Sequence, residues 1–174
     1  MPLHIVLFEP LIPANTGNIA RTCAATHTKL HLIKPLGFST DDKSLKRAGL
    51  DYWEHVDISY YENIEEFFHV NTGRFYYITK FAEQVYSDPD YSNPEENVFF
   101  IFGKETTGLP DELLREHPER GLRLPMHDEF VRSLNLSNVA AVVLFEALRQ
   151  QGFSGLDQDS FSGSDWRYPH LNKE

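Results

Sequence analysis

Three short stretches carry most of the side chains that could do chemistry in this sequence. They are NTGNIAR at residues 15–21, GKETTG at 103–108 and RSLNLSN at 132–138. Together they offer amides, hydroxyls, a carboxylate and a guanidinium, and their glycines let a ligand approach the backbone. Such groups can bind and orient a polar ligand jointly only if the fold brings the three stretches together.

In the first stretch, Asn15 or Thr16 can cap a helix whose opening turn holds Gly17 and Asn18. Arg21 lies about 9 Å further along the helix axis, but helical side chains lean toward the N-terminus. Its guanidinium can therefore return toward Asn15, which would place a cation and amide donors at one helix start. The alternative is an ordinary cap beside a surface arginine.

The second stretch has glycine at both ends and Glu105 inside, which suits a tight loop in close contact with a ligand. It lacks the GxxxxGK[ST] order of a phosphate loop, and GxGxxG occurs nowhere in the chain, so ordinary dinucleotide binding is not indicated. The alternative is a plain turn between a strand and a helix, with Glu105 exposed.

The third stretch alternates polar and apolar residues before an apolar helix. If residues 132–136 are extended, Ser133 and Asn135 face one side and Leu134 and Leu136 face the core. Asn135 or Ser137 then caps the helix, which is apolar almost all round from residue 139 to 148. Such a helix needs cover beyond its own sheet, and a partner subunit would supply it. Capping alone is the alternative explanation for these polar residues.

Metal and thiol chemistry are not favoured. His27 and His31 are four residues apart but straddle a predicted helix end and a strand, and the HDE run at 127–129 lacks the spacing of a tetrahedral site. Cys23 is the single cysteine and lies among small residues in a predicted helix, which is typical of a buried thiol. We therefore expect no metal.

Short apolar runs alternate with helical patterns, which predicts an α/β fold with a mostly parallel sheet flanked by helices, because runs such as VFFIF are apolar on both faces. The predicted strands are 4–9, 30–34, 55–60, 74–80, 97–103 and 121–126. The predicted helices are 15–28, 43–48, 61–70, 110–117 and 137–151.

Size and composition predict one folded domain, residues 1–151, followed by a Gly-, Ser- and Asp-rich tail, residues 152–174. The chain has no apolar run of membrane-spanning length and a single cysteine, so a cytoplasmic location is expected. Its net charge of −10 argues against a polyanionic partner, but the acid is concentrated. Residues 51–100 hold eleven acidic and two basic side chains, whereas residues 1–50 hold six basic and three acidic ones.

Taken in order, NTGNIAR, FGKETTGLP and LPM…RSLNLSN resemble the three motifs of the SPOUT class of RNA 2'-O-ribose methyltransferases. The opening IVLFEPLIPANTGNIARTCAA and the stretch PLGFSTDDKSLKRAGLDYW resemble its small single-domain type that methylates the tRNA wobble nucleotide, known as TrmL, YibK or CspR. The resemblance covers residues 3 to 151. It implies a C-terminal deep trefoil knot, S-adenosylmethionine as cofactor, tRNA as partner, and a homodimer that packs its first and last helices and shares its active site.

The same resemblance implies roles for individual residues. The functional polar residues would be Asn15, Arg21, Glu105, Ser133 and Asn135. Arg21 is expected to clamp the substrate phosphate and polarise the 2'-hydroxyl, because a guanidinium stays protonated and is a poor base. The knot loops would bind the cofactor through Tyr77, Ile78, Thr79, Gly103, Glu105, Gly108, Leu122, Leu124, Met126, Ser133 and Leu134. The basic candidates for RNA contact are Arg21, Lys43, Lys46, Arg47, Lys104 and Arg132.

Two other functions remain open at this point. The chain could methylate the ribose of a different RNA, such as ribosomal RNA, or it could be a catalytically silent module that binds RNA through the same surface. The intact set of polar motif residues argues against the silent module. The sequence leaves undetermined which tRNA is used, whether cytidine or uridine is preferred, whether an earlier modification is required, and which group acts as the general base.

Overall fold

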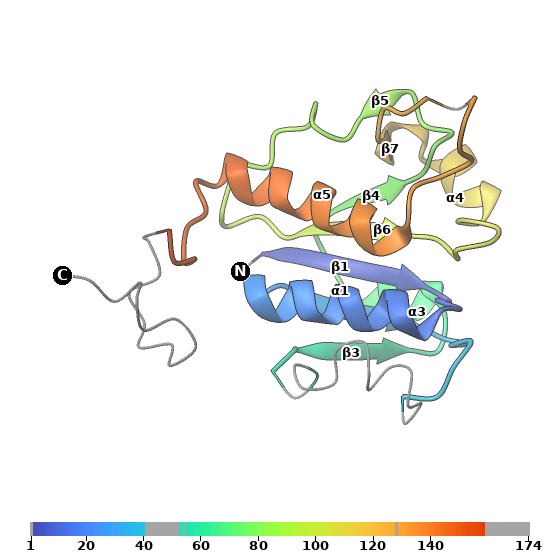
Figure 1. Ribbon diagram of the computed structural model, residues 1–174, viewed down its shortest axis with the longest axis horizontal. Helices are drawn as coiled ribbons and strands as arrows, with labels where there is room; N and C mark the ends of the chain where they lie inside the picture. The colour runs from blue at the N-terminus through green and yellow to red at the C-terminus, as the bar shows by residue number, and fades with distance from the viewer. Residues whose placement is uncertain (1, 41–52, 54, 128, 159–174) are drawn as a thin grey trace.

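The computed structural model describes residues 2–40, 53, 55–127 and 129–158, which form a seven-stranded sheet with helices on both faces (Figure 1). The strand order is β3-β2-β1-β6-β4-β7-β5, and every neighbouring pair is parallel. The strands are β1 (Leu3–Phe8), β2 (Lys29–Ile33), β3 (Ile58–Tyr61), β4 (Arg74–Ile78), β5 (Gln84–Val85), β6 (Val98–Phe102) and β7 (Gly121–Arg123). The predicted parallel α/β sheet is confirmed.

In the part of the chain that the structure describes, helices cover both faces of the sheet. The helices are α1 (Pro13–Thr26), α3 (Ile64–Val70), α4 (Asp111–Glu116) and α5 (Leu136–Gln150), with a 3-10 turn η1 (Pro118–Arg120) before β7. α1 and α5 lie side by side over one face (Figure 1), and α3 packs on the opposite face, where Leu113 and Leu114 of α4 join the same cluster. The sheet is therefore covered on both sides, which parallel sheets require.

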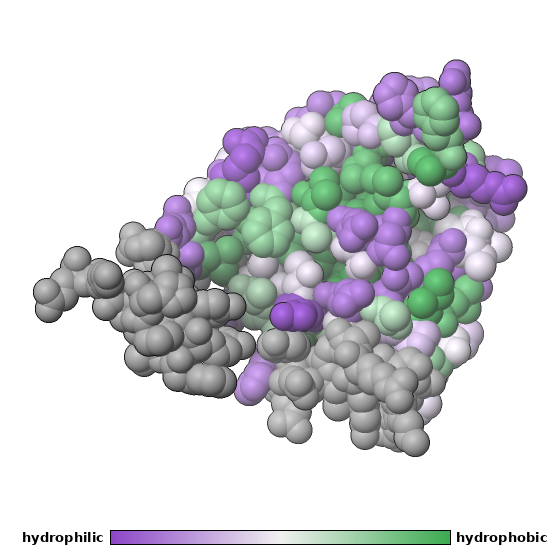
Figure 2. Space-filling model, viewed as in Figure 1, coloured by the Kyte–Doolittle hydropathy of each residue, from purple (hydrophilic) through white to green (hydrophobic). Residues whose placement is uncertain are grey.

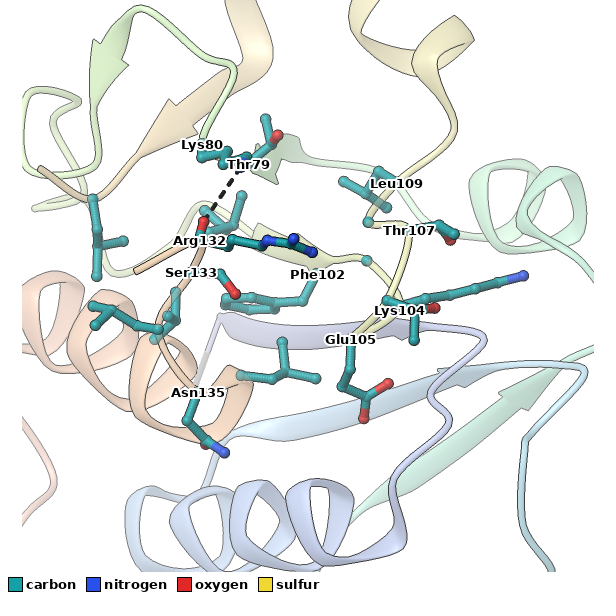
Figure 3. A pocket seen from close by; sticks show the side chains of 18 of the residues that line it. Thr79, Lys80, Phe102, Lys104, Glu105, Thr107, Leu109, Arg132, Ser133 and Asn135 are labelled. Atoms are coloured by element: carbon teal, nitrogen blue, oxygen red, sulfur yellow. Dashed lines mark hydrogen bonds between the residues drawn. The ribbon is translucent and has the colours of Figure 1, made fainter. Parts of the chain in front are cut away.

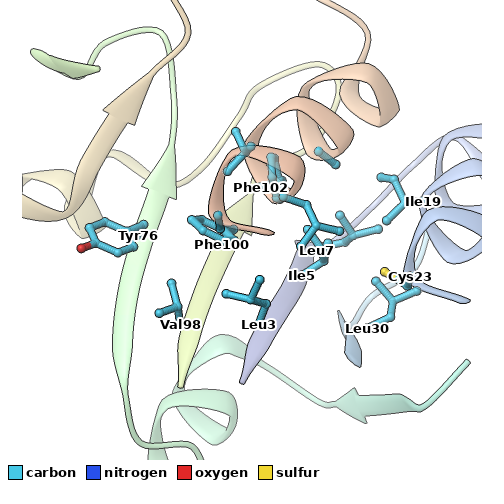
Figure 4. Packing of buried hydrophobic residues seen from close by; sticks show 14 of the residues in the cluster. Leu3, Ile5, Leu7, Ile19, Cys23, Leu30, Tyr76, Val98, Phe100 and Phe102 are labelled. Carbon is cyan, nitrogen blue, oxygen red and sulfur yellow. The ribbon is translucent and has the colours of Figure 1, made fainter. Parts of the chain in front are cut away.

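The central strand β6 explains why the core holds together. All five residues of VFFIF are buried, and they alternate between the two faces. Phe100 and Phe102 meet Ile5 and Leu7 of β1 and Ile19 of α1 in the larger cluster (Figure 4). Phe99 and Ile101 pack with Phe67 of α3 on the other side. This strand carries the GKETTG loop directly behind it, so the loop begins from the most rigid part of the fold.

The predicted elements that fall on described residues lie within a few residues of the observed ones, with two corrections. The first helix begins at Pro13, with Ile12 as its N-cap residue, so neither Asn15 nor Thr16 caps it. Strand β5 was not predicted, because two residues carry too little pattern. The predicted helix 43–48 lies outside the described residues. The tail is described to residue 158, and Phe153 and Leu156 pack against the larger core cluster.

A buried polar chain crosses the sheet on the α3 side. His4 Nδ1 lies 3.0 Å from His31 Nε2, and His31 Nδ1 lies 2.8 Å from the Tyr61 hydroxyl. The His31 side chain is 1% exposed. Burial lowers the pKa of His31 to about 3, helped by the nearby His4 and Lys29, and burial also lowers the pKa of His4. Both imidazoles are therefore neutral in the folded protein at neutral pH.

We expect this histidine pair to make folding stability sensitive to mild acid. Because the folded pKa of His31 lies below the ordinary value of 6.5, protons bind preferentially to the unfolded chain. Stability should be complete above about pH 6.5 and decline as the pH falls toward the folded value. Urea unfolding between about pH 7.5 and 5 measures this slope, and His31→Gln should flatten it. Equal slopes in both proteins would contradict the assignment.

Candidate active site

A cavity of about 830 Å³ opens at the carboxyl ends of β4 and β6 and against the segment that joins β7 to α5 (Figure 3). This is the edge where ligands bind in parallel α/β sheets. Its walls come from three loops, residues 78–81, 102–109 and 124–136, with the start of α1 on a fourth side. All three of the polar stretches singled out in the sequence therefore reach one cavity.

Nine of the eleven residues expected to bind a cofactor line this cavity. They are Ile78, Thr79, Gly103, Glu105, Gly108, Leu124, Met126, Ser133 and Leu134. Tyr77 and Leu122 do not line it: each is fully buried, Tyr77 in the cluster on the α3 side and Leu122 in the larger one. In β4 the next residue, Ile78, lines the cavity, so strand alternation turns Tyr77 to the opposite face. Leu122 is buried inside β7, two residues before Leu124 reaches the cavity.

Glu105 fixes the entrance to α1. Its carboxylate accepts hydrogen bonds from the backbone N–H of Leu11 at 2.9 Å and of Ile12 at 3.0 Å, and from the Asn15 side-chain amide at 3.3 Å. α1 has no side-chain cap of its own. A negative carboxylate beside the N-terminus of a helix also interacts favourably with the helix dipole. Glu105 therefore substitutes for a local cap, from 90 residues away.

Asn15 also forms a hydrogen bond with the third stretch. Its side-chain oxygen accepts a hydrogen bond from the Asn135 amide at 3.0 Å. The Asn135 oxygen in turn accepts bonds from the Ser137 N–H at 2.9 Å and the Ser137 hydroxyl at 2.6 Å, so the predicted cap of α5 by Asn135 is confirmed. In Figure 3 both Glu105 and Asn135 extend toward α1. Glu105, Asn15 and Asn135 form a single hydrogen-bonded chain, hereafter the motif bridge.

The GKETTG loop is closed by an isolated backbone bridge. Lys104 and Gly108 exchange hydrogen bonds, from the Lys104 N–H at 3.1 Å and from the Gly108 N–H at 3.0 Å. A Cβ on Gly103 would lie 2.1 Å from the carbonyl carbon of Gly108, and Gly108 itself has φ +74°. Glycine is thus required at both ends, at one for close approach and at the other for a left-handed backbone.

The cationic residues of the site have different surroundings. Lys104 pairs with Glu9, and its ammonium lies 5.7 Å from the centre of the Phe8 ring, so it is directed away from the cavity (Figure 3). Arg132 extends from the third stretch into the cavity, beside Ser133 (Figure 3). Arg21 is exposed on α1 and is not among the residues that line the cavity of this chain. Lys43, Lys46 and Arg47 lie outside the described residues.

One prediction about local conformation was wrong, and several lining residues were missed. Leu134 is 45% exposed and lines the cavity, so the alternation in RSLNL does not bury it. Asn15 engages Glu105 and Asn135 through its side chain. Lys80 and Phe81 also line the cavity. Their place at the carboxyl end of a predicted parallel strand was the signal that could have found them.

Neither metal binding nor membrane insertion is supported by the part of the chain that the structure describes. Within it, no three His, Cys, Asp or Glu side chains gather closely enough to hold a metal ion. Among the same residues, every helix is too short or too polar to cross a bilayer. His27 ends α1 and His31 lies in β2, as the sequence indicated. Cys23 is buried, and burial raises the pKa of its thiol to about 12.

We expect Glu105→Ala to destabilise the fold by about 2 kcal/mol, because two backbone N–H groups and one amide lose a charged acceptor. Glu105→Gln should have a smaller effect, since one acceptor oxygen remains. The exposed Glu116 of α4 provides the control, and Glu116→Ala should leave stability within about 0.5 kcal/mol. Urea unfolding gives all four values. A Glu105→Ala protein as stable as the unaltered one would sink the proposed role of the motif bridge.

Comparison with known proteins agrees with this geometry. The model of the SpoU rRNA methylase family matches residues 2–145. A Listeria innocua protein provisionally named a tRNA (cytidine(34)-2'-O)-methyltransferase is 68% identical over 160 residues, which cover 91% of this chain and 94% of that protein.

Solved structures share the fold as well. One, described in connection with the 2-OH methylation of C/U34 on tRNA, is 40% identical, has a TM-score of 0.79, and covers 87% of this chain and 97% of its own. An AdoMet-bound rRNA methyltransferase from Sinorhizobium meliloti is 26% identical with a TM-score of 0.74, covering 84% of this chain and 56% of its own. The family match spans most of the sequence and all three polar stretches, and the chain therefore belongs to the SpoU rRNA methylase family.

Proposed function

We propose that this protein transfers a methyl group from S-adenosylmethionine to the ribose 2'-hydroxyl of the wobble nucleotide, cytidine or uridine 34, of tRNA. The observation that carries the proposal is the motif bridge, which joins stretches 90 and 120 residues apart beside one cavity. A relative at 68% identity and a structural neighbour at 40% identity are both described with methylation at position 34 of tRNA.

The cavity suits the cofactor. Its volume of about 830 Å³ lies within the range of small-molecule sites. Ile78, Leu124 and Met126 provide apolar wall, and the loop closed by Gly103 and Gly108 provides exposed backbone edges for a nucleoside. The cofactor, when bound, supplies an electrophilic methyl group on a positively charged sulfur, so no metal is needed. The AdoMet-bound neighbour shares the fold.

The residues of this chain would then orient the acceptor. The cofactor would supply its methyl group to the ribose 2'-oxygen and leave as a neutral thioether, and the hydroxyl proton would pass to a phosphate oxygen or to water. Ser133 and Arg132 enter the cavity and can hold the ribose and its phosphate (Figure 3). Asn15, Glu105 and Asn135 hold the three polar stretches together. We assign Arg21 to the phosphate next to the target ribose, where its planar fork can polarise the hydroxyl.

A homodimer would bring Arg21 to a cavity. Figure 2 shows apolar surface on the face formed by α1 and α5. Val142 is 42% exposed and Phe145 is 47% exposed, and α1 presents the small exposed Ala14 and Ala25 together with Arg21. Exposed apolar surface of this kind on two adjacent helices favours pairing with a second copy. In such a dimer, Arg21 of the partner subunit would complete each site.

We also propose that the C-terminal segment is threaded as a trefoil knot. β7 lies between β4 and β5, and the chain then returns to the middle of the sheet as α5, which packs on α1, β1 and β6. The segment that leads from β5 to β6 holds the far end of α5. Gln150 accepts from the Tyr91 N–H at 2.8 Å, and Gln151 donates to the Tyr91 carbonyl at 2.9 Å. These contacts fit a helix that has passed beneath that segment.

The proposed reaction predicts where label will appear. Purified protein incubated with methyl-labelled S-adenosylmethionine and total RNA should label tRNA, and nuclease digestion with mass spectrometry should place the methyl group on the ribose of nucleotide 34. A tRNA carrying a 2'-deoxynucleotide at that position should stay unlabelled, because it lacks the acceptor oxygen. Label confined to ribosomal RNA would replace the proposed substrate. RNA binding without any label would point to a silent binding module.

The substrate also implies that the enzyme works in the cytoplasm, where mature tRNA is used.

The proposed dimer predicts complementation between two inactive variants. Arg21→Lys keeps the charge but loses the fork, so it should turn over far more slowly than the unaltered enzyme. When Arg21→Lys and Ser133→Ala subunits are mixed by co-expression, half of the dimers are mixed and each holds one intact site. The mixture should recover about a quarter of normal activity. Recovery no greater than the sum of the two variants would show that Arg21 and Ser133 act within one subunit.

A further inference from the structure

Two phenylalanine side chains near the cavity are almost fully exposed to solvent. Phe81 is 76% exposed and Phe130 is 81% exposed, the highest values among the large apolar side chains of the described residues. Neither lies on the α1–α5 face assigned to the dimer. Exposed aromatic side chains in one region commonly mark a binding surface.

The two phenylalanines come from loops that contact each other. Phe81 follows β4 and lines the cavity, while Phe130 lies two residues before Arg132, which also lines it. The Lys80 ammonium donates to the Arg132 carbonyl at 3.3 Å, and this bond links the two loops (Figure 3). Phe81 and Phe130 are therefore carried on two loops joined at the same cavity rim.

Both rings are accompanied by cations. The Lys80 ammonium lies 5.3 Å from the centre of the Phe81 ring, and Arg132 is exposed two positions after Phe130. The basic residues that line the cavity are Lys80, Lys104 and Arg132, and Lys104 is paired with Glu9. Aromatic faces that alternate with cations match single-stranded RNA, whose bases stack and whose phosphates need neutralising.

We propose that Phe81 and Phe130 are stacking surfaces for unpaired bases of the RNA loop, and that they hold the loop so that the target ribose enters the cavity. Lys80 and Arg132 neutralise the phosphates between those bases. Stacking tolerates any base, so this pair provides grip and position, and the identity of the base is left to other contacts. The inference rests on the proposed function, because it names how that substrate is held.

The test compares variants in RNA binding, cofactor binding and turnover. Phe81→Ala and Phe130→Ala should each weaken binding of an anticodon stem-loop about tenfold, measured by fluorescence anisotropy. KM for tRNA should rise accordingly, with a smaller change in kcat. Phe81→Trp and Phe130→Trp should retain the binding affinity of the unaltered protein, whereas Phe81→Leu should lose affinity as Phe81→Ala does. Val70→Ala, which trims an exposed apolar residue of α3 that is 62% exposed, is the matched control and should have no effect.

Salt dependence separates stacking from charge. Arg132→Ala should reduce the slope of log Kd against log salt by about one unit, because one phosphate contact is lost. The two alanine variants at Phe81 and Phe130 should shift the same line without changing its slope. Sedimentation should find their oligomeric state unchanged, and calorimetry should find their affinity for S-adenosylmethionine unchanged.

Several results would overturn the inference. If the alanine variants bind the stem-loop normally, the rings do not hold RNA. If they lose cofactor affinity, the rings belong to the cofactor site, and if they alter the oligomeric state, the rings contact a second copy. A failure of the proposed function would look different, because the unaltered protein would then leave nucleotide 34 unmethylated whatever happens to the variants.

Discussion

The arrangement of the site depends on the satisfaction of a few polar groups at the start of α1. Two backbone N–H groups there, one part-buried and one exposed, donate to the Glu105 carboxylate, and a hydrogen bond to a charged group contributes about 1.5–3 kcal/mol. By accepting both hydrogen bonds, Glu105 holds the GKETTG loop against the start of α1. Asn15 then extends the same chain to Asn135, the residue that caps α5. One motif bridge thus joins the start of α1 to the GKETTG loop and to the segment before α5.

The parallel sheet makes that bridge possible. β1, β6 and β4 are adjacent and point the same way, so the chain leaves all three at one edge. β1 and β6 are buried nearly throughout. Their packing in the core therefore fixes the positions at which the loops that follow them begin. The remaining path of each loop is set by its own backbone angles, and two residues there have a positive φ. Glu9 has φ 46°, just before the first loop, and Gly108 has φ 74° at the end of the second. These turns aim the loops toward one another.

Much of this could be read from the sequence because it is local. Buried strands, the acidic first turn of α4 and the Asn135 cap each follow from a few neighbouring residues. The cap of α1 could not be read in the same way. Asn15 looked like a cap because its type favours one, yet the helix starts at Pro13 and its capping acceptor is Glu105. An acceptor 94 residues away in the sequence cannot be recognised from the few residues around the start of the helix.

Exposure was the other quantity that local patterns predicted poorly. Leu134 was expected in the core on the strength of alternation, but alternation assigns sides only in a strand that has a sheet partner, and residues 133–135 have no regular secondary structure. Tyr77 and Leu122 are a different case, because both lie in paired strands and are buried beside the cavity wall. Their assignment to the cofactor site came from the family resemblance, and which face of a strand end meets a cavity depends on the loops around it.

Net charge gives a further example of a global average that hides a local surface. The acid that makes the chain negative is densest between residues 51 and 100, and much of it lies on α3 and on the segment before β6. Lys104, a cation within the second motif, is neutralised by Glu9. Lys80 and Arg132 remain at the cavity, on two loops that a single hydrogen bond joins. Electrostatic attraction weakens over about 10 Å at ordinary salt, so a polyanion at the cavity responds most to the charged side chains that line it, which, apart from the paired Lys104, are Lys80, Arg132 and the Glu105 carboxylate.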